Sequence, residues 1–79
     1  MIYCKLEEKQ IDSAIYHIGT TVGNLSGKIM FFADERKLLL LEQADNDAIR
    51  ILHIVRLYNK YRPEFEKGIF PDKLAIEIG

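Results

Sequence analysis

KIMFFADERKLLLLEQADNDAIRILHIVRLYNKY, residues 28–61, is the stretch of this chain that decides its fold. It begins with two short apolar runs, Lys28–Ala33 and Lys37–Gln43, which are typical of β-strands. Asp34, Glu35 and Arg36 separate the runs and favour a tight turn, so the pair predicts a hairpin. A strand with one solvated face alternates apolar and polar residues, and neither run does so. We therefore expect both faces of this hairpin to be covered.

The second half of the stretch predicts a helix at residues 48–62. Asp45, Asn46 and Asp47 precede it, and each is a residue type that caps helix N-termini. Pro63 should end it, because a proline disfavours helical geometry in the residue before it. The apolar positions cover a wider arc than a helix lying on one core requires. They are Ala48, Ile51, Leu52, Ile54, Val55, Leu57, Tyr58 and Tyr61.

Less distinct patterns flank this stretch. Ile2–Leu6 predicts a short first strand, and the alternation of Lys73–Ile78 predicts a last strand after a loop at Glu64–Asp72. From Glu7 to about Leu25, apolar residues recur at the spacing of one helical face, which predicts a first helix. They are Ile11, Ala14, Ile15, Ile18, Val22 and Leu25. The order β-α-β-β-α(-β) predicts a two-layer α+β domain with two helices on one face of a small, mainly antiparallel sheet.

Composition limits the possible classes of protein. The 79 residues suffice for one domain, residues 1–79, with residues 63–79 as a tail that carries the last strand. A net charge of −1 and a pI of about 6.1 argue against general binding to nucleic acid. Cys4 is the only cysteine, which fits a reducing compartment. No apolar run of the sequence, Leu38–Leu41 included, is long enough for a membrane helix, and we see no signal peptide. We expect a cytoplasmic protein.

No pattern in the sequence indicates catalysis, a metal or a cofactor. His17 and His53 lie on different predicted helices without a neighbour at metal-ligand spacing. Cys4 has no identifiable base, so an inert thiol is the simpler interpretation. The segment Gly19–Gly23 lacks the lysine and the strand-to-helix context of a phosphate loop. We expect a protein that is not an enzyme and that has no catalytic, metal or cofactor-binding residues.

The surplus apolar surface instead predicts a partner-binding role. Contiguous exposed apolar patches usually mark interaction sites. The hairpin and the helix after it would supply two such surfaces, one on the sheet and one on the helix. The predicted partner interface comprises Met30, Phe32, Leu39, Leu41, Ile54, Leu57, Tyr58 and Tyr61.

Two other functions remain open. Basic residues form a narrow stripe on the same helix, and they could contact RNA phosphates. They are Arg50, His53, Arg56 and Lys60. This alternative is a small RNA-binding α+β domain. A small enzyme that works at a dimer interface is the third possibility, and only Cys4 and scattered carboxylates support it.

The hairpin and its junction with the helix carry a family resemblance. The strand Leu38–Leu41, the junction Ala44–Arg50 (Ala-Asp-Asn-Asp-Ala-Ile-Arg) and the amphipathic helix that follows resemble the Pcc-type small subunits of the KEOPS complex. That complex takes part in threonylcarbamoyl modification of tRNA adenosines. The order of a short strand, a helix and a hairpin before the junction also fits the family.

This resemblance implies a non-catalytic dimerisation subunit. Such a subunit pairs with a like or paralogous subunit through its sheet, forming a homodimer or heterodimer. Its helices pack on the helical surface of a larger, ATP-dependent catalytic subunit, and it contacts tRNA at most indirectly. The chain departs from the family after Arg50, where Leu52, His53 and Ile54 stand in place of an asparagine-serine pair, and in its added tail from Pro63. These departures favour a divergent or accessory paralogue.

Overall fold

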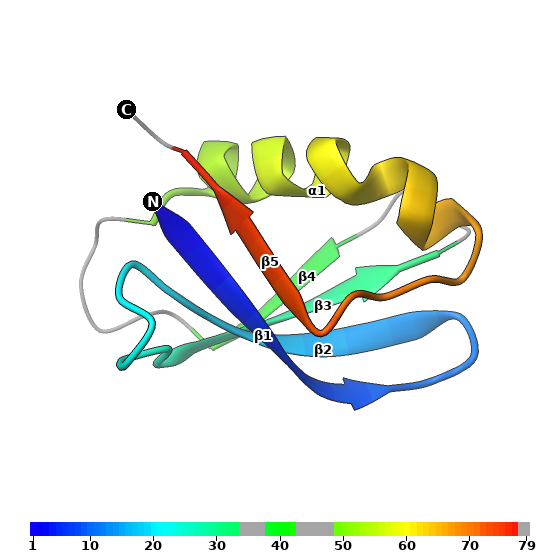
Figure 1. Ribbon diagram of the computed structural model, residues 1–79, viewed down its shortest axis with the longest axis horizontal. Helices are drawn as coiled ribbons and strands as arrows, with labels where there is room; N and C mark the ends of the chain where they lie inside the picture. The colour runs from blue at the N-terminus through cyan, green and yellow to red at the C-terminus, as the bar shows by residue number, and fades with distance from the viewer. Residues whose placement is uncertain (34–37, 43–48, 78–79) are drawn as a thin grey trace.

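The computed structural model describes residues 1–33, 38–42 and 49–77, which form an antiparallel sheet with a helix across one face (Figure 1). The elements are β1 (Ile2–Lys9), β2 (Ser13–Gly19), β3 (Gly27–Phe32), β4 (Leu38–Glu42), α1 (Ile51–Glu66) and β5 (Lys73–Ile76). The strand order is β4-β3-β2-β1-β5. The first four strands therefore form a meander, and the chain returns over α1 to place β5 beside β1.

Alternation along the strands gives the sheet two different faces. The face beneath α1 is buried and carries Ile2, Cys4, Ala14, Tyr16, Ile18, Ile29, Phe31 and Leu74. The opposite face, called the open face below, carries Tyr3, Lys5, Ile15, His17, Lys28, Met30, Phe32, Leu39, Lys73 and Ala75. No helix of the described part covers the open face.

Phe65 joins the helix to the sheet. Its ring stacks on Phe31 of β3 at a centroid distance of 5.1 Å and on Phe70, in the segment that leads to β5, at 5.3 Å. Its ring also lies 5.8 Å from the ring of Tyr58, two turns earlier on the same face of the helix, and Phe65 is fully buried. Aromatic pairs at such distances contribute about 0.5–1.5 kcal/mol each beyond the burial of their area. Phe65 is thus the point at which helix, sheet and returning chain meet.

The helix continues past the proline that was expected to end it. Pro63 is exposed within α1, so water can reach the carbonyl that loses its helical donor. One turn later the helix closes with a Schellman motif, in which Ile69 donates to the carbonyl of Glu64 and Gly68 to that of Phe65. Gly68 has a φ of 76°, a left-handed conformation that glycine adopts without strain. Burial of Phe65 explains why the extra turn is retained despite the proline.

The predicted first helix is wrong. Residues 13–19 form β2, which pairs with β1 and β3, and the fold therefore has one helix among its described residues rather than two. The apolar spacing misled because positions four apart, such as Ala14 and Ile18, share a face in a strand as well as in a helix. Ile11 and Val22, which completed the helical pattern, lie exposed in the connections on either side of β2.

The other element predictions hold with shifted ends. The α+β class, the first strand, the hairpin strands and the last strand are confirmed, and β1 is longer than Ile2–Leu6. The helix begins at Ile51 rather than at residue 48, and Arg50 is its N-cap, whose backbone N–H donates to Nδ1 of His53 at 3.2 Å. The turn at residues 34–36 and the caps at residues 45–47 lie outside the described residues.

Gly19 permits a close approach that no other residue would allow. A Cβ at this position would collide with the carbonyl oxygen of Asn24 and would lie 3.0 Å from the Cα of Leu25. We expect Gly19→Ala to lower the free energy of unfolding by about 1–3 kcal/mol, because the backbone of the β2–β3 connection must move. Gly23→Ala is the matched control, since nothing lies within 4 Å of its Cβ. Chemical denaturation followed by circular dichroism measures both, and equal stability of the two variants would contradict the close approach.

Phe65→Ala should remove a large share of the stability of this small domain. Truncating a buried phenylalanine costs about 3–5 kcal/mol, and a domain of this kind has about 5–15 kcal/mol in total. Ile69→Ala, at a residue that is 51% exposed, should change the unfolding free energy little. The same denaturation experiment applies, and a Phe65→Ala variant as stable as the control would show that the aromatic cluster does not hold α1 on the sheet.

Candidate interaction surface

The two edges of the sheet differ in how their backbone groups are satisfied. At the β5 edge, the hydroxyl of Tyr61 accepts from the N–H of Ala75 at 3.1 Å and donates to its carbonyl oxygen at 3.3 Å. Nζ of Lys60 donates to the same carbonyl at 2.9 Å. Two side chains of α1 therefore occupy the outward N–H and C=O of Ala75 in the middle of β5, which opposes the addition of another strand there.

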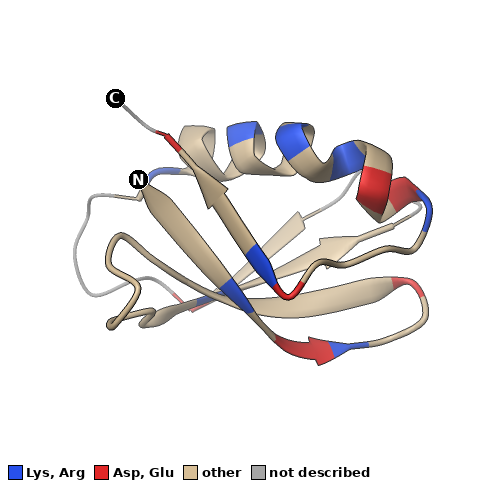
Figure 2. Cartoon of the chain, in the orientation of Figure 1, with Lys and Arg blue, Asp and Glu red and all other residues tan. Residues whose placement is uncertain are grey.

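The β4 edge has no such cover in the described part of the chain. β4 pairs with β3 on one side only, and Leu39, Leu40 and Leu41 are 46%, 38% and 42% exposed. Natural proteins usually protect an edge strand with charge, proline or a covering segment. Residues 38–41 are all leucine and carry no charge, so β4 is tan in Figure 2 as far as Glu42. An exposed, uncharged edge strand is a template for pairing with another chain.

The open face next to this edge is also apolar. Ile15 lies opposite Met30, and Met30 lies opposite Leu39, so the three side chains form one row across β2, β3 and β4. Phe32 stands beside this row on β3, and Ile15, Met30 and Phe32 are only half-buried. The edge of β4 and this row together make up a surface that we call the β4 surface.

The predicted interface residues fall into two groups. Met30, Phe32, Leu39 and Leu41, from the hairpin, are exposed or half-buried on β3 and β4. Those on the helix are placed differently: Ile54 is 2%, Leu57 0% and Tyr58 5% exposed, in the core of the chain itself, and Tyr61 caps the β5 edge. The structure therefore corrects the helix part of the predicted interface, whose residues contact the chain itself. The apolar arc of α1 is wide because it contains exposed residues as well as core residues. Ile51, Leu52 and Val55 are 61%, 64% and 39% exposed, and they were not among the predicted contacts.

The basic stripe is only partly available to a ligand. Nδ1 of His53 accepts from the backbone of Arg50, and Nζ of Lys60 donates to Ala75. Arg50 and Arg56 are exposed along the helix, which Figure 2 shows with several cationic positions. Two engaged groups and two free ones fall short of the aligned cationic surface that tracks a phosphate backbone.

The candidate nucleophile is buried. Cys4 is 3% exposed, and burial raises the pKa of its thiol to about 12. A thiol with that pKa stays protonated at neutral pH and is not a nucleophile. Nε2 of His17 lies 3.1 Å from a carboxylate oxygen of Glu7 on the open face, the face of the sheet opposite to α1. Among the described residues no cluster of His, Cys, Asp and Glu could hold a metal ion, and no helix is long and apolar enough to cross a membrane.

Comparisons with family models, with curated proteins and with solved structures return no match to this chain.

Cys4 gives a direct test of the buried thiol. The thiolate fraction at pH 8 falls roughly a thousandfold when the pKa rises from its ordinary value of 9.0 to about 12. We expect the folded protein to react with Ellman's reagent at pH 8 at least a hundredfold more slowly than the protein in guanidinium chloride. Because the raised pKa favours the thiol form, reactivity should increase as pH rises towards 12. Equal rates for folded and unfolded protein at pH 8 would show that the thiol is accessible and ionised.

Proposed function

We propose that this chain is a non-catalytic assembly module that dimerises with a second copy of itself by pairing of the two β4 edges. The observation that carries the proposal is the asymmetry of the sheet. Tyr61 and Lys60 occupy the outward backbone groups of Ala75 at the β5 edge, whereas no described residue covers β4, and residues 38–41 of β4 are uncharged. A protein with two uncovered edges would form open-ended assemblies. One closed edge and one open edge limit association to a pair.

The geometry of such a pair is self-complementary. A two-fold axis perpendicular to the sheet runs the two β4 strands antiparallel and keeps each face on its own side. Leu38 and Leu40, on the helix side, then meet the same residues of the second copy, and Leu39 meets leucine on the open face. Because residues 38–41 are all leucine, the centre of the contact is apolar. The two apolar rows of the open face would become one continuous surface across the dimer.

The size of this contact predicts a modest affinity. Full burial of a leucine side chain contributes about 1.5–3 kcal/mol, and each backbone hydrogen bond about 0.5–1.5 kcal/mol net. The exposed leucines are already more than half-buried, so each contributes only part of that value. After the entropy cost of association, we expect dissociation in the micromolar range.

The larger setting of the module is also part of this proposal. The resemblance to KEOPS small subunits supports a place in a tRNA-modification complex, with the dimer presenting its surface to a catalytic subunit. That support comes from Leu38–Leu41 and the following junction, of which residues 43–48 lie outside the described part. The strand β2 stands where the family pattern has a helix, so the first half of the resemblance is lost. Mixing the purified chain with the ATP-dependent subunit from the same cells tests this setting, and failure to co-elute would remove it without affecting the dimer.

Leu39→Lys and Leu40→Lys should each shift the protein from dimer to monomer. A lysine on an edge strand opposes strand addition, because pairing would bring like charges together and bury them. Sedimentation equilibrium between about 1 and 100 µM covers the affinity expected for a micromolar pair. We expect the unmodified chain to show a dimer at the upper end of that range and each variant to remain a monomer.

Ile11→Lys is the matched control for these variants. Ile11 is 96% exposed in the β1–β2 connection, so the change adds the same charge away from β4. The control should dimerise as the unmodified chain does, and circular dichroism should confirm that all three variants fold. A monomer at every concentration for the unmodified chain, or a dimer that persists in Leu39→Lys, would overturn the proposal.

A further inference from the structure

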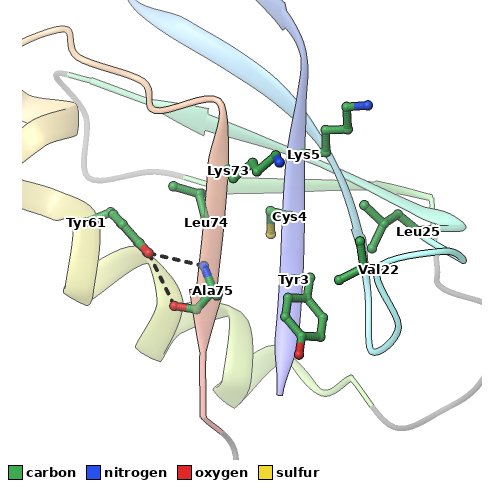
Figure 3. A pocket seen from close by; sticks show the side chains of 9 residues that line it. All are labelled: Tyr3, Cys4, Lys5, Val22, Leu25, Tyr61, Lys73, Leu74 and Ala75. Carbon is green, nitrogen blue, oxygen red and sulfur yellow. Dashed lines mark hydrogen bonds between the residues drawn. The ribbon is translucent and has the colours of Figure 1, made fainter.

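A cleft of 440 Å³ lies over β1 and β5, at the opposite edge of the sheet from β4 (Figure 3). Its lining comprises Tyr3, Cys4, Lys5, Val22, Leu25, Tyr61, Lys73, Leu74 and Ala75. Val22 and Leu25 come from the β2–β3 connection and stand on one side of β1, while Tyr61 stands on the far side of β5 (Figure 3). Clefts of about 300–1,000 Å³ are the size that small-molecule sites have.

The sheet register explains why the surface is hollow here. On the open face, Tyr3 lies opposite Ala75 on one side and Gly19 on the other. The small side chain of Ala75 leaves space on one side of the ring. Gly19 also admits the backbone of Asn24 and Leu25, which brings the β2–β3 connection beside the ring of Tyr3. The apolar part of the cleft is therefore built by the fold.

The next row of the open face is basic. Lys73 lies opposite Lys5, Lys5 opposite His17, and His17 opposite Lys28. Glu7 neutralises one half of this row, with carboxylate contacts of 3.1 Å to His17 and 3.2 Å to Lys28. No acidic side chain of the described residues pairs with the other half, Lys5 and Lys73, and this half borders the cleft. Like charges directly opposite each other on neighbouring strands destabilise a sheet, so the pair Lys5 and Lys73 lowers the stability of the folded protein.

We propose that this cleft binds a small amphipathic carboxylate, with the anionic head between Lys5 and Lys73 and the apolar body against Tyr3, Val22 and Leu25. An anion placed between the two ammonium groups makes charge-assisted hydrogen bonds and relieves their repulsion. Because the rest of the lining is apolar, the ligand should carry a hydrocarbon or aromatic body and not be a bare anion. The cleft lies at the closed β5 edge, so its ligand does not compete with pairing of β4.

Octanoate is the probe for this site. Inorganic phosphate, which has only the charge, and 1-octanol, which has only the apolar chain, are its two controls. Titration of ¹⁵N-labelled protein should move the amide signals of Tyr3, Lys5, Val22, Leu25 and Lys73. Octanoate should bind at least tenfold more tightly than either phosphate or octanol, because only octanoate satisfies both parts of the cleft. Equal affinity for octanol, or shifts centred on β4 instead, would overturn the proposal.

Variants of the lysine pair separate binding from folding. Lys5→Met and Lys73→Met keep an apolar stem and should each weaken octanoate binding about tenfold or more, as loss of a charged hydrogen-bond partner does. Lys9→Met, at the far end of β1, is the matched control and should bind normally. Lys73→Glu should abolish octanoate binding and raise the melting temperature by a few degrees, because it replaces repulsion with attraction across the strands. Normal binding by Lys73→Glu would contradict the assignment.

Discussion

The contact between Phe65 and Phe31 is the interaction on which the rest of the structure depends. The sheet is a meander that can form from local hairpins, but its inner face is apolar and needs a second layer. α1 supplies that layer only because Phe65, beyond an exposed proline, stacks on β3 and on Phe70. The same ring fixes where the helix ends. It thereby fixes the path of the chain into β5, which completes the sheet beside β1.

This packing also makes the two edges of the sheet unequal. α1 crosses the sheet so that Lys60 and Tyr61, near its C-terminal half, reach the backbone of β5. The β4 edge receives no equivalent cover from the described residues, and its leucines remain partly exposed. Protection at one edge and exposure at the other result from the way in which α1 lies across the sheet. The proposed pairing through β4 and the proposed ligand cleft beside β5 are separate consequences of that one arrangement.

Sequence patterns predicted the candidate surface better than they predicted the contacts of the helix. Met30, Phe32, Leu39 and Leu41 could be identified because continuous apolar strands leave apolar side chains on both faces whatever packs on one of them. The helix residues could not be divided into core and surface in this way. A wide arc of apolar residues does not reveal which side of the helix faces the sheet. Leu57 and Leu52 have the same side chain, yet Leu57 is buried and Leu52 is exposed. The cleft had no signal in the sequence, because Tyr3, Gly19 and Ala75 become neighbours only through strand pairing.

The sequence by itself determined the α+β class, the hairpin, the helix after it and the last strand, because these follow from local periodicity and residue type. The tertiary structure alone decided that residues 13–19 are a strand, since both neighbouring strands supply hydrogen-bond partners that a local pattern cannot reveal. It also decided that α1 passes Pro63, because the burial of Phe65 outweighs the local preference of proline. Periodicity reports on residues a few positions apart, whereas both of these outcomes depend on contacts between distant parts of the chain.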